Sequence, residues 1–178
     1  FGGDNNQLFA WYRFESLVHP PTIYIYDLNN HSSKIYYDSK ANFEKDKYIL
    51  KQDFYISKDG TKVPIFIAHD RDLVLDNLRP TLLYGYGGFN ISIKPYFNKT
   101  IPIILENGGV YASANIRGGG EYGQEWHEAG MLNNKQNVFD DFISAAEYLI
   151  KEGYTSTETL ALRGGSNGGT LVGAVINQ

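Results

Sequence analysis

Six residues at positions 164–169, Gly-Gly-Ser-Asn-Gly-Gly, constrain the fold of this chain more than any other segment. A strand-like run at 159–163 precedes them, and an apolar run at 170–176 follows. Glycines on both sides of Ser166 let a strand and a helix approach more closely than side chains would permit. The segment therefore predicts a sharp strand-to-helix turn, with Ser166 in a strained backbone conformation and its hydroxyl lifted clear of a sheet.

The spacing of Gly164, Ser166 and Gly168 matches G-x-S-x-G, the pattern of the nucleophile elbow in α/β-hydrolases. Two alternatives are a glycine-rich turn that only packs strand against helix, and a phosphate-binding loop. The phosphate loop is disfavoured because it needs a lysine after its last glycine, and Thr170 follows Gly169 here. Ser166 is thus the candidate nucleophile.

Composition excludes several classes of function. The chain has 178 residues, a net charge of −4 and no basic run long enough to follow a phosphate backbone, which argues against nucleic acid as a partner. No segment approaches the ~20 apolar residues of a membrane span. The absence of cysteine excludes disulfides and thiolate metal sites. With only four scattered histidines besides, we expect neither a metal nor a cofactor.

The two ends of the chain suggest a piece of a longer protein. It begins at Phe1 rather than Met, and Gln178 comes only about three turns into the helix that the elbow should start. A helix of that kind needs a complete sheet to pack on. We therefore expect a fragment.

Residues 1–50 are aromatic and strand-like, with strands expected at 8–14, 22–28 and 34–37. Short aromatic strands with frequent turn signals favour a propeller blade or a sandwich.

From residue 54 onward the pattern becomes α/β. Asp59-Gly60 predicts the apex of a hairpin over 54–68. Buried strands are expected at 81–86 and 110–116, and a helix at about 134–152 with Gly153 as its C-terminal cap. Apolar residues recur at helical spacing along this helix and form one apolar stripe: Val138, Phe139, Phe142, Ile143, Ala146, Leu149 and Ile150. The strand before the elbow should then run parallel to the earlier ones.

Two further glycine-rich loops are candidate functional sites. The loop at 84–89 follows a buried strand, where α/β-hydrolases place the second oxyanion donor; the first is the backbone N–H after the nucleophile, here that of Asn167. A tight turn with core tyrosines is the alternative. The run at 118–123 matches G-x-G-x-x-G, but it continues through 124–127 in place of opening a helix, so nucleotide binding is disfavoured.

The catalytic triad is incomplete in this chain. In α/β-hydrolases the acid and the histidine follow the serine, and no His, Asp or Glu follows Ser166. His127 is therefore interpreted as a structural or surface residue, as are His19, His31 and His69.

Read together, these motifs resemble the prolyl oligopeptidase family of serine peptidases. The resemblance rests on Leu-Tyr-Gly-Tyr-Gly-Gly-Phe-Asn at 83–90, Ala-Asn-Ile-Arg-Gly-Gly-Gly-Glu-Tyr-Gly at 114–123, Trp126-His127, and residues 164–169. The motifs match in order and spacing, and the resemblance covers the chain from about residue 50 to its end. Residues 1–50 resemble the last propeller blade and its crossing into the hydrolase domain, and 51–178 the first part of the catalytic domain.

The resemblance implies a cytoplasmic endopeptidase that cuts short peptides on the carboxyl side of proline. By residue it implies Ser166 as nucleophile, an oxyanion N–H from Asn167, a second oxyanion bond from the Tyr86 hydroxyl, and Phe89 against the substrate proline ring. The family's catalytic Asp and His have no counterpart here, so we expect this polypeptide alone to be inactive. When full length it is expected to be a monomer.

Rival interpretations stay open at this point. Another peptidase or esterase on the same scaffold, of the oligopeptidase B or acylaminoacyl peptidase type, would share the elbow. A non-catalytic truncated module is the alternative from a different class.

Overall fold

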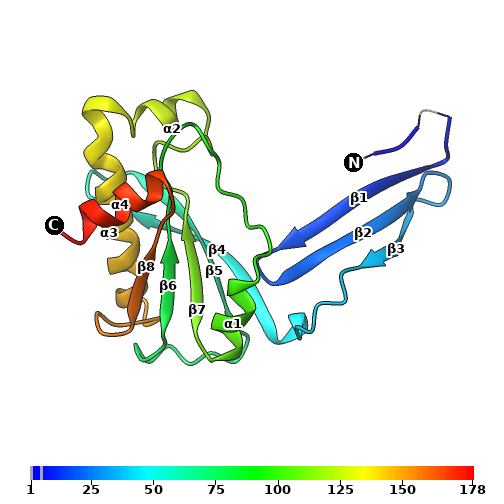
Figure 1. The fold of residues 1–178 in the computed structure, drawn as a ribbon, viewed down its shortest axis with the longest axis horizontal. Coiled ribbons are helices and arrows are strands. Elements are labelled where there is room, and N and C mark those ends of the chain that lie inside the picture. The colour runs from blue at the N-terminus through cyan, green and yellow to red at the C-terminus, as the bar shows by residue number, and fades with distance from the viewer. Residues whose placement is uncertain (1, 5) are drawn as a thin grey trace.

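A computed structural model describes residues 2–4 and 6–178. The N-terminal part is an antiparallel sheet of three strands that extends as an arm from the larger body (Figure 1). Its order is β1-β2-β3, and neighbouring aromatic rings such as those of Tyr12 and Tyr24 stack across it at 4.9 Å. The three expected strands are confirmed, with bounds β1 (Phe9–Ser16), β2 (His19–Asp27) and β3 (Ser32–Asp38).

The larger body contains a five-stranded mixed sheet of order β4-β5-β7-β6-β8. The β4–β5 and β5–β7 pairs are antiparallel, whereas β7–β6 and β6–β8 are parallel. The hairpin predicted at Asp59-Gly60 joins β4 to β5, and the expected parallel strand–helix–strand unit is confirmed. The strands are β4 (Tyr48–Ile56), β5 (Lys62–Asp70), β6 (Thr81–Tyr84), β7 (Val110–Ala114) and β8 (Leu160–Arg163).

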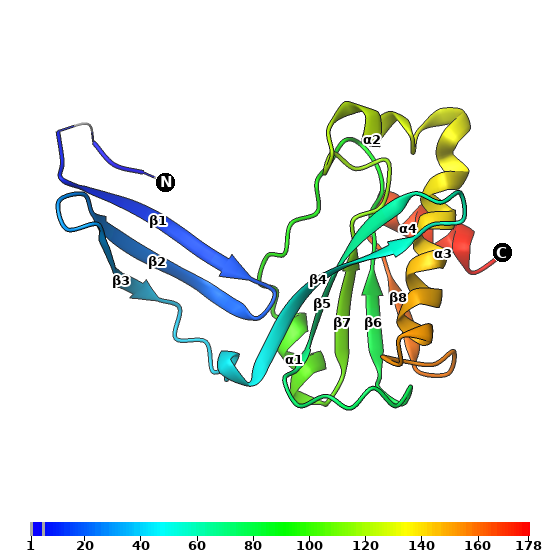
Figure 2. The same cartoon turned by 180° about the vertical axis from the view of Figure 1, so that it is seen from behind.

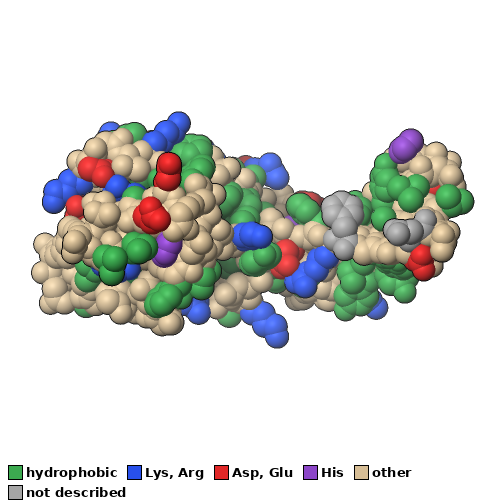
Figure 3. All heavy atoms as spheres, turned by 90° about the horizontal axis from the view of Figure 1, so that it is seen from above, with side chains coloured by type: hydrophobic (Ala, Val, Ile, Leu, Met, Phe, Trp, Pro, Cys, Tyr) green, Lys and Arg blue, Asp and Glu red, His purple; other side chains and the backbone are tan. Residues whose placement is uncertain are grey.

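Helices lie on both faces of this sheet, α1 on one and α3 with α4 on the other (Figures 1 and 2). Their bounds are α1 (Thr100–Glu106), α2 (Gln124–Glu128), α3 (Lys135–Lys151) and α4 (Asn167–Val175), with short 3-10 turns at Lys45–Lys47 and Leu132–Asn134. None of the helices described is long and apolar enough to cross a membrane. Acidic and basic side chains are interspersed on the face seen in Figure 3.

Strand β7 supplies both layers of the core because its side chains alternate between the two faces. Val110 and Ala112 are fully buried on the side of α3, whereas Tyr111 packs with the buried Ile101 and Leu105 of α1. The three-stranded arm joins this second cluster through Leu17, which is buried at the β1–β2 turn. The α/β class expected from the sequence is thereby confirmed.

Helix α3 ends as predicted, but its buried face differs from the predicted stripe. Gly153 adopts φ 88°, and the N–H groups of residues 153 and 154 bond to the carbonyls of Ile150 and Leu149, which closes the helix in a Schellman motif. The fully buried positions include Ala145 and Asp141, whereas Ile143 and Ile150 are only partly buried. A carboxylate therefore occupies the middle of the buried face.

Asp141 is buried because an arginine, a serine and a backbone N–H surround it. The guanidinium of Arg117 donates to both of its carboxylate oxygens at 2.6 and 2.9 Å, and Ser57 Oγ donates at 2.6 Å. Arg117 also binds the half-exposed Asp59 at 2.5 Å. This hydrogen bond holds the pKa of Asp59 down at about 2. Burial alone would lower the pKa of Arg117, but its bonds to the two carboxylates outweigh burial and raise it.

The cluster ties three elements together: the end of β7, the β4–β5 hairpin and α3. We expect Arg117→Met to lower the free energy of unfolding by about 3–5 kcal/mol, because it leaves Asp141 charged, buried and without its counterion. Asp59→Asn is the matched control on the exposed side of the same arginine, with an expected loss of at most about 1 kcal/mol. Urea unfolding at pH 7 measures both. Equal losses for the two variants would contradict the prediction.

Candidate active site

Ser166 lies in a sharp turn between β8 and α4, as the sequence predicts. The strand ends at Arg163 and the helix begins at Asn167. Ser166 has φ 53° and ψ −119°, a conformation that residues other than glycine rarely adopt and that costs about 1–3 kcal/mol. Its side chain is exposed and makes no capping hydrogen bond to α4, although serine at this position usually does. The hydroxyl is therefore presented to solvent.

The turn packs directly against the end of β6. A β-carbon on Gly168 would lie 2.6 Å from the carbonyl oxygen of Gly85, so the backbone of α4 touches the backbone that follows β6. A β-carbon on Gly164 would in turn collide with the carbonyl of Gly168. Only glycine fits this contact, which brings Ser166 next to the loop that follows β6.

That loop, residues 85–90, carries the two aromatic residues proposed from the sequence. The Asn167 side chain donates from Nδ2 to the carbonyl oxygen of Tyr86 at 2.6 Å. Tyr86 is partly buried, whereas Phe89 has φ 54° and is 72% exposed. Asn167, the first residue of α4, has a backbone N–H without a carbonyl partner inside the helix. The structure thus brings Ser166, Asn167 and Tyr86 to one end of the sheet, with Phe89 exposed on the same loop.

The loop at 117–130 supports the other side of residues 85–90. The backbone N–H of Asn90 donates to the Gly118 carbonyl at 3.2 Å, and His127 Nδ1 lies 2.7 Å from the same oxygen. The same Nδ1 also lies 3.2 Å from the backbone nitrogen of Asn90, so whether it donates to Gly118 or accepts from Asn90 depends on the tautomer, and in either case His127 contacts the backbone of these two loops. The expectation that 124–127 is not helical is wrong, because α2 begins at Gln124, directly after Gly123. It is a single short turn held by tertiary contacts, which its local sequence does not indicate.

Lys135 is a contact residue that the sequence reasoning missed. Its Nζ donates to the carbonyl oxygen of Gly87 at 3.0 Å. Burial lowers the pKa of this lysine. The sequence contained one signal for this contact. Lys135 is a cation at the start of the helix, where the helix dipole disfavours positive charge, so another interaction was to be expected there.

The site presents an exposed serine hydroxyl next to the start of α4, without a base bonded to it in the described part of the chain. Among residues 2–4 and 6–178, no histidine or carboxylate forms a hydrogen bond with Ser166 Oγ. In the same part of the chain no three His, Asp or Glu side chains are grouped to hold a metal ion. The arrangement suits attack by a serine on a carbonyl, provided that a base is supplied.

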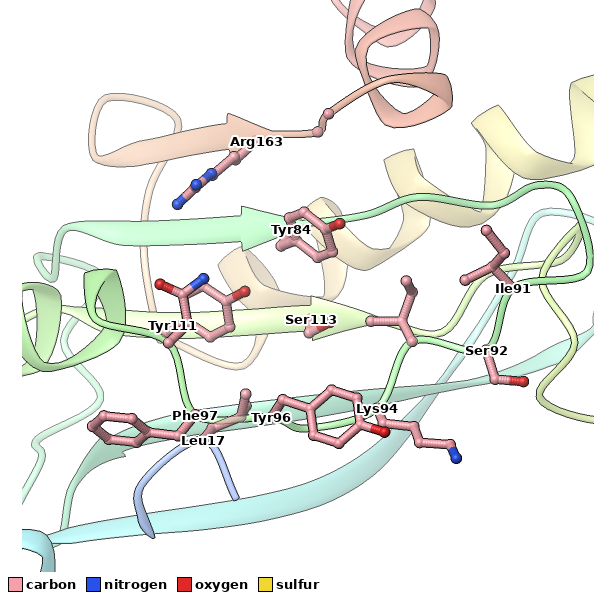
Figure 4. A pocket seen from close by; sticks show the side chains of 14 residues that line it. Leu17, Tyr84, Ile91, Ser92, Lys94, Tyr96, Phe97, Tyr111, Ser113 and Arg163 are labelled. Carbon is pink, nitrogen blue, oxygen red and sulfur yellow. The ribbon is translucent and has the colours of Figure 1, made fainter. Parts of the chain in front are cut away.

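A cavity of about 700 Å³ lies beside the serine turn. Its lining includes Tyr84, Tyr111, Arg163 and the turn residues Gly164 and Gly165, but not Ser166, Tyr86 or Phe89 (Figure 4). Tyr111 faces α1, so the cavity opens on the α1 side of the sheet. Burial raises the pKa of Tyr111 to about 12, which keeps its hydroxyl neutral. The cavity therefore lies on the face of the sheet opposite α3 and is lined in part by the end of β8.

Comparison with known proteins places these motifs in one family. Residues 95–178 match the model described as the prolyl oligopeptidase family. A prolyl endopeptidase of Elizabethkingia meningoseptica is 50% identical over 176 residues, 99% of this chain and 25% of the relative. The chain thus spans about a quarter of the length of the curated relatives it matches.

Solved structures agree with this result. A prolyl endopeptidase structure superposes with a TM-score of 0.91 at 49% identity, covering 99% of this chain and 26% of that one. Prolyl oligopeptidase B from Galerina marginata, solved with a 25-residue macrocyclization substrate, superposes with a TM-score of 0.87 at 38% identity, covering 97% and 25%.

The backbone strain at Ser166 can be tested without reference to activity. Ser166→Gly and Ser166→Ala both remove the hydroxyl, but only glycine adopts φ 53° and ψ −119° without strain. After the larger chain entropy of unfolded glycine is allowed for, we expect the Gly variant to be more stable by about 1 kcal/mol. Thermal and urea unfolding measure the difference. An Ala variant as stable as the Gly variant would mean that the turn stores no strain.

Proposed function

Because this chain belongs to the prolyl oligopeptidase family, we propose that it is the part of a serine endopeptidase that carries the nucleophile, Ser166. The substrates would be short peptides cut on the carboxyl side of proline. The observation that carries the proposal is the strained, exposed Ser166 between β8 and α4, packed against the loop of Tyr86. Peptide substrates are supported by the substrate-bound relative.

In the proposed reaction the Ser166 oxygen attacks the carbonyl carbon of the substrate's proline residue and loses its proton to a histidine base. The tetrahedral intermediate carries its negative charge on the former carbonyl oxygen. Two donors meet that charge, the Asn167 N–H and the Tyr86 hydroxyl, and fixed donors of this kind act on the transition state. As the intermediate collapses, the histidine gives its proton to the departing amine and the peptide bond breaks, which leaves an ester on Ser166 that water then hydrolyses.

Phe89 supplies the proposed contact for proline. Its ring is exposed on a loop whose backbone is held from two sides, which favours a binding surface over a core position. A flat aromatic face packs on the pyrrolidine ring without needing polar partners.

The rest of the protein is proposed by the same reasoning. Residues 1–50 would form the last blade of a β-propeller and the crossing, and 51–178 the first part of an α/β-hydrolase catalytic domain. The antiparallel arm and the mixed sheet with helices on both faces support this division. The catalytic Asp and His would come from the longer polypeptide, which we propose to be cytoplasmic and monomeric.

The nucleophile is tested with a fluorophosphonate probe on the full-length protein. We expect covalent labelling of Ser166, because the probe reacts only with a serine that a base and an oxyanion hole activate. Ser166→Ala is the control and should neither label nor turn over substrate. Labelling at a different serine, or none in a folded protein, would favour a non-catalytic role.

The oxyanion role of Tyr86 is tested by Tyr86→Phe. We expect kcat on a proline-containing peptide to fall by ~10²–10³, with KM little changed, because the hydroxyl acts on the barrier and not on ground-state binding. Steady-state kinetics separate the two constants. An unchanged kcat would return Tyr86 to the role of a core aromatic.

A further inference from the structure

The first residue of α3 reaches the loop that carries the oxyanion donor. Lys135 Nζ donates to the carbonyl oxygen of Gly87, the residue directly after Tyr86, at 3.0 Å. Its ammonium also lies 5.9 Å from the centre of the Phe139 ring, one helical turn further along. The lysine therefore bridges the start of α3 and the loop.

This lysine is placed against two local preferences. It is partly buried, and in the part of the chain that the structure describes no carboxylate lies within ion-pair distance of it. It also stands at the positive end of the α3 dipole, where a cation is disfavoured. Neither helix formation nor an ion pair explains a lysine here. Among the described residues, the side-chain hydrogen bond of Lys135 goes to the Gly87 carbonyl, and this contact explains its position.

The loop backbone at this point is wedged into the core. Gly87 has φ 61°, and a β-carbon on it would lie 2.8 Å from the Ile116 side chain and collide with Val138 of α3. This packing fixes the position of the Gly87 α-carbon but not the rotation that directs its carbonyl oxygen. Lys135 Nζ donates to that oxygen and so holds its direction.

Two successive peptide groups after the Tyr86 α-carbon are thereby fixed by side chains. Asn167 Nδ2 holds the Tyr86 carbonyl at 2.6 Å, and Lys135 Nζ holds the Gly87 carbonyl at 3.0 Å. Asn167 belongs to α4 and Lys135 to α3, so the loop is attached to both helices. An oxyanion donor lowers a barrier only when it is already in place as charge develops.

We propose that Lys135 is a positioning residue for the Tyr86 hydroxyl, fixing the Gly87 carbonyl so that the oxyanion donor is held ready. The inference rests on the proposed function, in which Tyr86 is that donor. The ammonium of Lys135 contacts the Gly87 carbonyl and the Phe139 ring, and in the described residues it makes no hydrogen bond with Ser166 or the Tyr86 hydroxyl. Its loss should therefore affect kcat and leave KM nearly unchanged, since the substrate's own contacts remain.

The test is a double-mutant cycle in the full-length protein. Lys135→Met keeps an unbranched apolar side chain that corresponds to the lysine stem up to Cε, and removes the donor. We expect kcat to fall about tenfold with KM within about twofold, because small displacements of a catalytic group cost up to ~10² in rate. In a Tyr86→Phe background the same change should cost less than about twofold, since residues that act as a unit are not additive.

Two further variants make the result specific. Lys135→Arg keeps a cationic donor and should retain most of kcat. Lys151→Met, at the exposed far end of α3, is the matched control and should be unchanged. If thermal unfolding shows that Lys135→Met does not fold, Lys135→Ala, which also lacks a side-chain donor, takes its place in the cycle.

The outcomes separate this inference from the proposed function. A Tyr86→Phe variant with undiminished kcat overturns both the oxyanion role and the inference. A large loss for Tyr86→Phe, with Lys135→Met either silent or equally costly in both backgrounds, overturns the inference alone. A rise in KM with kcat unchanged would also overturn it, since that result would assign Lys135 to substrate binding.

Discussion

Backbone contacts without room for a side chain hold the serine turn against the end of β6. A β-carbon on Gly168 would lie 2.6 Å from the Gly85 oxygen, and one on Gly85 would lie 2.5 Å from the ring of Phe142 in α3. Strand end, helix start and the buried face of α3 therefore meet in direct contact. Because nothing in this contact can yield cheaply, the strain of the turn falls on Ser166 and its side chain is directed outward.

Polar side chains then hold the loop at 85–90, which lies next to this contact. Asn167 and Lys135 each bind one carbonyl of residues 85–90, from α4 and α3 respectively. On the far side, a β-carbon on Gly118 would lie 2.6 Å from the Gly87 carbonyl oxygen, so the loop after β7 supports the same peptide. Helix α3 is itself anchored to the end of β7 through Asp141 and Arg117. The buried ion pair is thus connected to the position of the loop that bears Tyr86.

Local signals predicted those elements whose residues are chosen for backbone conformation. Gly60 has φ 87° and correctly indicated the hairpin turn, and Gly153 has φ 88° and correctly indicated the end of the helix. Helices α1 and α2 were missed, because helices of seven and five residues depend on packing more than on propensity. The buried Ile101 and Leu105 of α1 show the four-residue spacing that could have indicated it. Asp141 stood in the apolar pattern of α3 as the one charged residue at a core position.

The sequence by itself determined the class of the fold and the turn at Ser166, because glycine spacing and hydrophobic period are properties of neighbouring residues. The family was indicated by the resemblance of its motifs at 83–90, 114–123 and 164–169. The tertiary structure decided which side chains from distant segments support the loop of Tyr86. Lys135 is 48 residues from Gly87, and Asn167 is 81 residues from Tyr86. Hydrogen bonds between such residues depend on how α3 and α4 pack on the sheet. No pattern within a few residues of either partner contains that geometry.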